Sequence, residues 1–154
     1  MLASMLAAHG FGRDPGLVET AASLDALTGL EPPGAGSPYE SAQAAIPGYY
    51  AKAQELEGQA ARLEAAAQGL RADAAALDVA AAGARERTAA IYAAQAEALR
   101  AQAARMEQEA QALRQQAAEI RRLAALLGMQ LVGHMDGWEY HIDGHDADET
   151  AFWD

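Results

Sequence analysis

The chain has 154 residues, a formal net charge of −11 and no cysteine, and its 51% hydrophobic content includes only 6% aromatic residues. Alanine makes up most of the hydrophobic fraction; it forms helix readily but buries little area. This composition excludes a thick globular core and favours helices that pack on one another. No stretch approaches the ~20 apolar residues of a membrane-spanning helix.

Charge is distributed unevenly along the chain. Residues 49–127 carry ten basic and ten acidic side chains, whereas residues 129–154 carry seven acidic side chains and no Lys or Arg. Phosphate backbones are bound through clustered cationic contacts, so this acidic segment argues against DNA or RNA as a direct ligand. We therefore expect protein partners and no direct nucleic-acid binding.

Residues 1–30 are predicted to form two short helices. Gly10 ends the first, because glycine readily adopts the left-handed conformation found after helices. The second follows Asp14 as N-cap, has Pro15 at its first position and ends at Gly29. The apolar start of the chain fits packing within the protein or contact with a membrane. We favour packing, because the run is short and no cationic residues precede it.

Residues 31–37 form a predicted linker that is extended around its prolines and loose around its glycines. Ser37 then caps a new helix, with Pro38 at the first helical position and Glu40 placed to complete a capping box. Pro47–Gly48 is expected to kink or interrupt this helix, because proline cannot donate a backbone hydrogen bond.

A seven-residue repeat dominates the predicted helical segment 38–128. One ladder, mostly of large side chains, runs in two registers: Tyr49, Leu56, Leu63, Leu70, Leu77, Ala84 and Ile91, then Tyr92, Leu99, Met106, Leu113, Ile120 and Leu127. A small-residue ladder follows four positions later: Ala53, Ala60, Ala67, Ala74, Ala81 and Thr88, then Ala96, Ala103, Ala110, Ala117 and Ala124. These heptads predict a coiled-coil seam with large residues at position d and alanine at position a.

The extra residue between Ile91 and Tyr92 has two interpretations. One long helix can absorb it by local unwinding, and the good helix formers around it favour this interpretation. Alternatively the chain turns back near Gly83 into an antiparallel helical hairpin, with each arm keeping its own register. The predicted fold is thus mainly α, with a long heptad helix or its hairpin alternative as the central element.

The C-terminal residues change their period from helical to alternating. Residues 129–142 flank Asp136-Gly137, a strong two-residue turn signal, and predict a small β-hairpin after a helix that ends at Gly128. In this pairing Leu131 opposes Ile142, which makes one face apolar. Residues 143–154 are predicted to be an acidic, irregular tail.

The search for chemistry finds no catalytic or nucleotide-binding signature, and we expect neither enzymatic activity nor a cofactor. His134, Glu139 and His141 share one face of the predicted β-hairpin and are weak candidates for a Zn²⁺ site. A solvated polar face is the favoured interpretation, so no metal is expected.

The segments Ala101-Gln102-Ala103-Ala104-Arg105 and Gln115-Gln116-Ala117-Ala118 illustrate the Ala/Gln-rich character of the helical region. In this composition the chain resembles small helical bacteriophage virion proteins, such as tail, neck or internal ejection components. The resemblance implies a multi-copy virion part without catalysis, located in the virion; without it the cytoplasm would be the expected location.

Two other function classes remain open beside a structural subunit that associates with itself or with other subunits. One is a helical protein of lipid or granule surfaces, resembling phasins, which the alanine-rich face disfavours. The other is an adaptor that presents the C-terminal segment to a partner protein. Aromatic side chains are favoured interface anchors, and the candidates in this segment are Trp138, Tyr140, Phe152 and Trp153.

Overall fold

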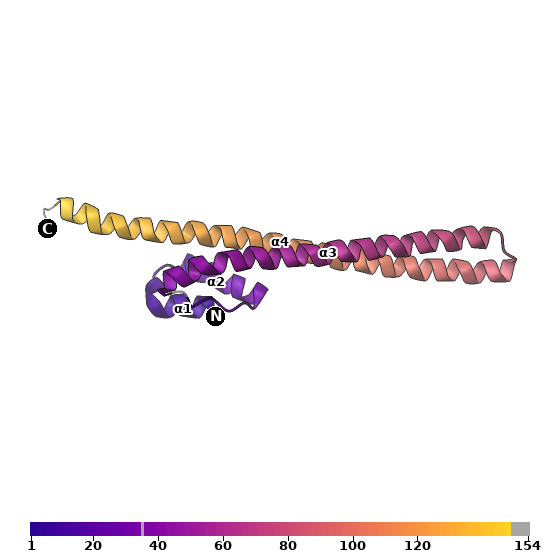
Figure 1. Ribbon diagram of the computed structural model, residues 1–154, viewed down its shortest axis with the longest axis horizontal. Coiled ribbons are helices and arrows are strands. Elements are labelled where there is room, and N and C mark those ends of the chain that lie inside the picture. The colour runs from indigo at the N-terminus through magenta and orange to yellow at the C-terminus, as the bar shows by residue number, and fades with distance from the viewer. Residues whose placement is uncertain (35, 149–154) are drawn as a thin grey trace. The chain divides into compact units, whose positions relative to one another are not determined.

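The computed structural model describes residues 1–34 and 36–148, with side chains described as far as His134. Its described residues are mainly helical and contain no strand, which confirms the predicted mainly α class. The elements in order are α1 (Leu2–Leu6), the π-helix η1 (Ala7–Phe11), α2 (Pro15–Thr28), α3 (Pro38–Ala82) and α4 (Glu86–Asp148) (Figure 1).

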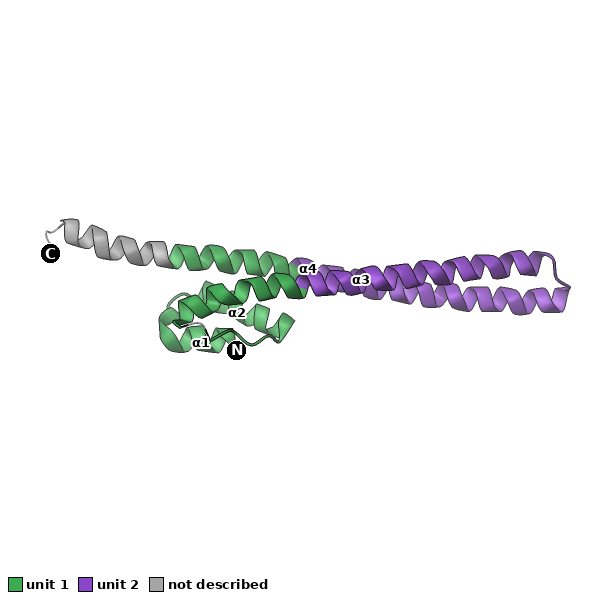
Figure 2. Ribbon diagram, in the orientation of Figure 1, with its two compact units in different colours: residues 1–52, 119–154 green, residues 53–118 purple. Residues whose placement is uncertain are grey.

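The chain divides into two compact units (Figure 2). Unit 1 contains residues 1–52 and 119–154, and unit 2 contains residues 53–118. The first unit therefore combines the short N-terminal helices with the start of α3 and the later part of α4, and the second consists of the remaining parts of α3 and α4.

The short helices of unit 1 begin and end where the sequence predicts. Gly10 has a φ of 104° inside η1, where it and His9 interrupt the helical backbone, and Gly29 has a φ of 62° after α2. At the start of α2, Asp14 Oδ1 accepts a hydrogen bond from the backbone N–H of Leu17 at 3.3 Å. Glycine and a capping aspartate therefore set these boundaries through local chemistry.

A long-range cap joins α1 to α2. The carboxylate of Asp25 accepts hydrogen bonds from the backbone N–H groups of Leu2 at 3.1 Å and Ala3 at 2.9 Å. These N–H groups lie in the first turn of α1, where no intrahelical acceptor exists. Asp25 thus satisfies two donors and places a negative charge at the positive end of α1.

The start of α3 is the predicted capping box. Ser37 Oγ accepts from the Glu40 N–H at 3.1 Å, and Glu40 Oε1 accepts from the Ser37 N–H at 2.9 Å. The expected interruption at Pro47–Gly48 is absent, because α3 continues through both residues to Ala82. Gln43, whose carbonyl loses its helical donor to Pro47, is exposed to water, which can satisfy it.

The core of unit 1 is built from large side chains of all its helices. Leu6, Leu17, Leu24, Leu127 and Leu131 are each at most 1% exposed. The ring of His134 on α4 packs against that of Phe11 with 4.5 Å between centroids, and its Nδ1 lies 3.9 Å from Asp14 Oδ2. The later part of α4 therefore packs directly on the N-terminal helices.

This packing corrects the prediction for residues 129–142. They form no β-hairpin: α4 is helical from Glu86 to Asp148, so it does not end at Gly128. Helical spacing brings Leu127, Leu131 and His134 to one side of α4, where both leucines are buried and the His134 ring packs against Phe11. Part of the predicted irregular tail, up to Asp148, is also helical, and residues 149–154 lie outside the described residues.

Unit 2 is an antiparallel helical hairpin (Figure 2). Helix α3 ends at Ala82 and α4 starts at Glu86, with the turn at residues 83–85. Three ion pairs join the arms at steps of seven residues, forward on α3 and backward on α4: Glu64–Arg114, Arg71–Glu107 and Asp78–Arg100. The continuous helix that the sequence favoured is wrong, and the alternative turn near Gly83 is present.

Burial inside the hairpin follows the small-residue ladder. The alanines at Ala60, Ala67, Ala74, Ala96, Ala103, Ala110 and Ala117 are all 0% exposed. Only the opposite helix of this two-helix unit can cover the alanines midway along it. Ile91 is 52% exposed, because its register belongs to α3, whereas α4 follows the register of Tyr92. The turn therefore explains the extra residue between the two ladders.

Replacing Asp25 with alanine should destabilise unit 1 by roughly 0.5–2 kcal/mol, the usual cost of losing a helix cap. Asp25→Asn keeps an acceptor oxygen and should cost less. Urea unfolding followed by far-UV circular dichroism would measure both variants. Equal stability of Asp25→Ala and the parent protein would show that the cap contributes nothing.

Replacing Ala110 with leucine should destabilise the hairpin by ~1–3 kcal/mol, because the fully buried site has no room for a larger side chain. Leu113→Ala should cost less than the ~2–5 kcal/mol of a fully buried leucine, because Leu113 is only partly buried. Chemical denaturation at low protein concentration would compare the two. A higher free energy of unfolding for Ala110→Leu than for the parent protein would mean that the helices are widely spaced.

Candidate functional site

Large and charged side chains lie on opposite sides of the buried alanines in unit 2. Three residues after an alanine comes a large apolar residue, about 60° to one side of it on a helix. Four residues after the same alanine comes a charged residue, about 40° to the other side. The leucine flank consists of Leu63, Leu70, Leu77, Leu99, Met106 and Leu113. The charged flank consists of Glu64, Arg71, Asp78, Arg100, Glu107 and Arg114.

The charged flank pairs every one of its members across the hairpin. Two pairs are bidentate: the Arg71 guanidinium donates to Glu107 at 3.0 and 2.6 Å, and that of Arg114 donates to Glu64 at 3.0 and 2.5 Å. These hydrogen bonds are the main cause that lowers the pKa of both glutamates below 4.5. This flank is therefore internally satisfied and fixes the antiparallel register of the arms.

The leucine flank is covered incompletely by the hairpin itself. All six of its side chains are partly exposed, whereas the neighbouring alanines are fully buried. A row of large apolar side chains along one side of a two-helix unit is a surface suited to further helix packing. The structure thus gathers most of the predicted seam residues on one hairpin, but divides them into a closed alanine line and an open leucine flank.

The remaining seam residues are buried at other places. Leu56 is 5% exposed in unit 2, and Ile120 and Leu127 are each 0% exposed in unit 1. The last two therefore belong to the core of unit 1 and not to the leucine flank.

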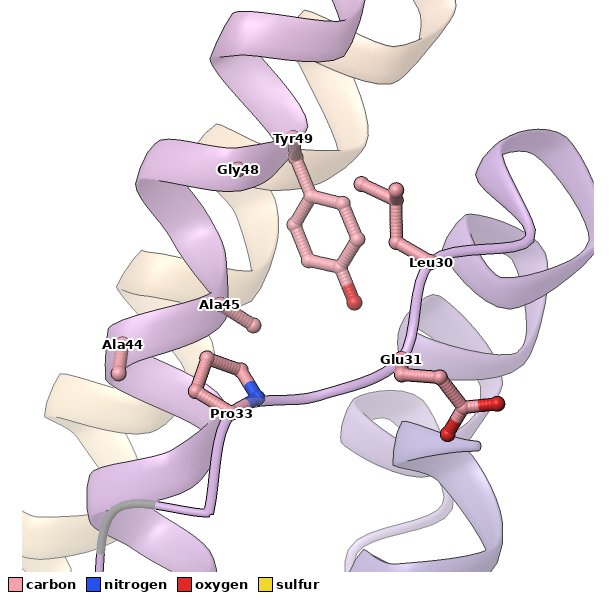
Figure 3. A pocket seen from close by; sticks show the side chains of 7 residues that line it. All are labelled: Leu30, Glu31, Pro33, Ala44, Ala45, Gly48 and Tyr49. Atoms are coloured by element: carbon pink, nitrogen blue, oxygen red, sulfur yellow. The ribbon is translucent and has the colours of Figure 1, made fainter.

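A small hollow in unit 1 is a second candidate site (Figure 3). It has a volume of about 190 Å³, and its lining is Leu30, Glu31, Pro33, Ala44, Ala45, Gly48 and Tyr49. Burial, followed by the charge of Asp25, raises the pKa of Tyr49 to about 12. A phenol with this pKa stays protonated at neutral pH and can donate a hydrogen bond, but it cannot serve as a base. The hollow therefore offers the Tyr49 hydroxyl as a polar contact.

The metal candidates do not form the arrangement that the sequence suggested. They depended on a β-hairpin, and residues 129–142 are instead part of α4. Among the described side chains, no group of three metal-ligating residues lies together. The side chains of Glu139 and His141 lie outside the described ones.

The aromatic candidates for partner binding also lie beyond the described side chains. For Trp138 and Tyr140 the structure describes only the backbone, as part of α4, and Phe152 and Trp153 lie outside the described residues. Their role stays a prediction. Sequence reasoning missed the charged flank, although its signal was present as charges that recur every seven residues, directly after the large residues.

No family model, curated protein or solved structure matched this chain when it was compared with known proteins. Within the described residues, no helix is both long enough and apolar enough to cross a membrane. The function must therefore be inferred from the surfaces of the chain itself.

Acid should weaken the hairpin more than it weakens a variant without the glutamate pairs. Glu64 and Glu107 have lower pKa values when folded than the ordinary 4.5, so the unfolded chain binds more protons in acid. Their contribution is complete above pH ~4.5 and is lost as the pH falls through the folded-state pKa values. Unfolding free energies from pH 7 to 2 would measure this loss.

The matched control is the double variant Glu64→Gln and Glu107→Gln. It should be less stable at neutral pH and should lose less stability between neutral and acidic pH than the parent. Identical pH profiles for the two proteins would show that these pairs do not stabilise the folded hairpin.

Proposed function

We propose that this chain is a structural protein that joins a multi-copy assembly by helix packing, without catalysis. The leucine flank is the contact surface, and its heptad spacing supports coiled-coil-like packing against helices of another copy or another subunit. Within this proposal, the Ala/Gln-rich composition supports a bacteriophage virion component as the kind of assembly.

The observation that carries the proposal is the difference in burial between the two ladders. The alanines that precede the leucine flank by three residues are fully buried, whereas the large side chains beside them stay partly exposed at six positions with heptad spacing. Apolar area left in water is the driving force for association, at about 25 cal/mol for each Å² that a partner covers. Buried a-type alanines and exposed d-type leucines thus suit a hairpin that completes its core by association.

The distribution of charge also supports the leucine flank as the contact surface. Ion pairs between the arms satisfy the charged flank, so a partner gains little there. The positions that border the leucine flank are mostly uncharged, and they are Ala66, Asp73, Ala80, Gln102, Glu109 and Gln116. A helix can therefore approach the leucine flank with little desolvation of charge.

Sedimentation velocity over a range of concentrations tests the proposal. The parent protein should sediment as an oligomer at tens of micromolar, a concentration of the order expected for weak helix association. The double variant Leu70→Glu and Met106→Glu should lose the association that depends on the leucine flank but remain helical, because it places carboxylates on this flank while leaving the buried alanines intact.

A matched control places the same charges elsewhere on the same two helices. Gln68 and Gln111 are exposed and lie outside both flanks, so the double variant Gln68→Glu and Gln111→Glu should associate like the parent. A compact monomeric parent protein at these concentrations would contradict self-association. An equal effect of both double variants would show that net charge, and not the leucine flank, controls the oligomeric state.

A further inference from the structure

Unit 1 contains an apolar groove between α3 and α4 that the proposed function does not use. It has a volume of about 630 Å³. Its lining is uncharged and consists of Ile46, Tyr50, Ala124, Ala125, Gly128, Met129, Val132 and Gly133. Small residues thus form much of its surface, and large apolar side chains stand beside them.

The groove exposes large side chains that unit 1 does not cover. Met129 is 70% exposed and Val132 is 53% exposed, the highest values among the described large apolar side chains of unit 1. A Cβ added at Gly133 would meet no atom within 4 Å, so this side of α4 has free space. At Gly128, by contrast, Ile46 Cδ1 lies 3.6 Å from an added Cβ, so α3 closes the other side.

Along α4, basic residues precede the groove and acidic residues follow it. Arg121 and Arg122 precede Met129, and the Arg121 guanidinium lies 5.9 Å from the centre of the Tyr50 ring that lines the groove. Acidic residues follow at Asp136 and Glu139, and no Lys or Arg occurs after Arg122. Arg122 and Asp136 are each seven residues from Met129, or ~10 Å along a helix.

We propose that the groove binds α4 of a second copy of this chain in antiparallel orientation, about a two-fold axis near Met129. The exposed Met129 and Val132 of each copy then cover one another. Arg122 of one copy faces position 136 of the other, and the symmetry repeats this match, whereas Glu139 falls opposite Glu119, whose charge is paired with Arg122 on its own helix. Parallel helices would instead place like charges opposite each other, which costs free energy.

A two-fold contact of this kind is self-complementary, because each copy contributes the same surface. The groove and the leucine flank consist of different residues, so association through one does not require the other. A chain with two self-complementary surfaces can link copies beyond a dimer. The groove contact therefore extends the proposed function without depending on it.

Disulfide crosslinking between two differently tagged copies tests the orientation, since the chain has no native cysteine. One copy carries Ala125→Cys and the other Gly133→Cys, each four residues from Met129 and both at exposed positions. An antiparallel pair brings these positions together, whereas either variant alone separates its two cysteines by ~12 Å along the helix. The mixture should therefore crosslink several-fold more than either variant alone.

Charge exchange tests the pairing independently. Arg122→Glu and Asp136→Arg should each raise the dissociation constant of the groove contact about three- to tenfold. Each substitution removes both symmetric pairs between residue 122 of one copy and residue 136 of the other. The double variant should recover the parent value. Arg122 also pairs with Glu119 on its own helix, and this pair is lost in both Arg122 variants, so recovery can come only from contacts of residue 136.

All variants are also made in the Leu70→Glu and Met106→Glu background, which removes association through the leucine flank. Preferential crosslinking of the mixture in this background, with recovery in the double charge variant, would establish the groove contact. Absence of the mixed crosslink, or stronger crosslinking of Ala125→Cys with itself, would overturn it, as would failure of the charge exchange. Circular dichroism of each variant confirms that the helices are intact, and the proposed function is tested separately by the leucine-flank variants.

Discussion

The close contact of two helices across a line of alanines is the constraint on which unit 2 depends. A methyl side chain lets helix axes approach toward the short end of the usual ~8–10 Å range. The alanines are fully buried there, and no space remains between the helices for the leucines three residues later. Those leucines therefore lie to one side, and the charged residues that follow them lie to the other. The small size of alanine thus creates both flanks.

Because of the same close contact, one flank stabilises the hairpin and the other flank is available for association between molecules. Ion pairs on one flank connect the arms of the hairpin and fix their register, while the other flank leaves large apolar side chains in contact with water. Exposed ion pairs contribute little free energy individually, but their bidentate geometry selects one register. Apolar burial, in contrast, is non-directional and grows with area. Each flank is therefore suited to a different task, one inside the hairpin and one between molecules.

Unit 1 also leaves an apolar surface exposed, although its core is built mainly from large side chains. Asp25 caps α1 from a distance in sequence, and the later part of α4 packs on the N-terminal helices through the contact of His134 with Phe11. This packing buries one side of α4 and leaves Met129 and Val132 exposed on another. In both units, completion of the internal core leaves an apolar surface that a second molecule can cover.

Local chemistry in the sequence determined the helix boundaries at Asp14, Gly29 and Ser37, the helical character of the heptad segment, and the ladder of alanines that becomes buried. Such features depend on residues within one or two turns, so composition and spacing reveal them. Tertiary structure alone decided three others: the turn at residues 83–85, the continuation of α4 through the Asp136-Gly137 turn signal, and the exposure of the leucine flank. Each depends on packing between residues far apart in sequence, such as the buried alanines of the two arms of the hairpin or Phe11 with His134, and this packing outweighs local propensity.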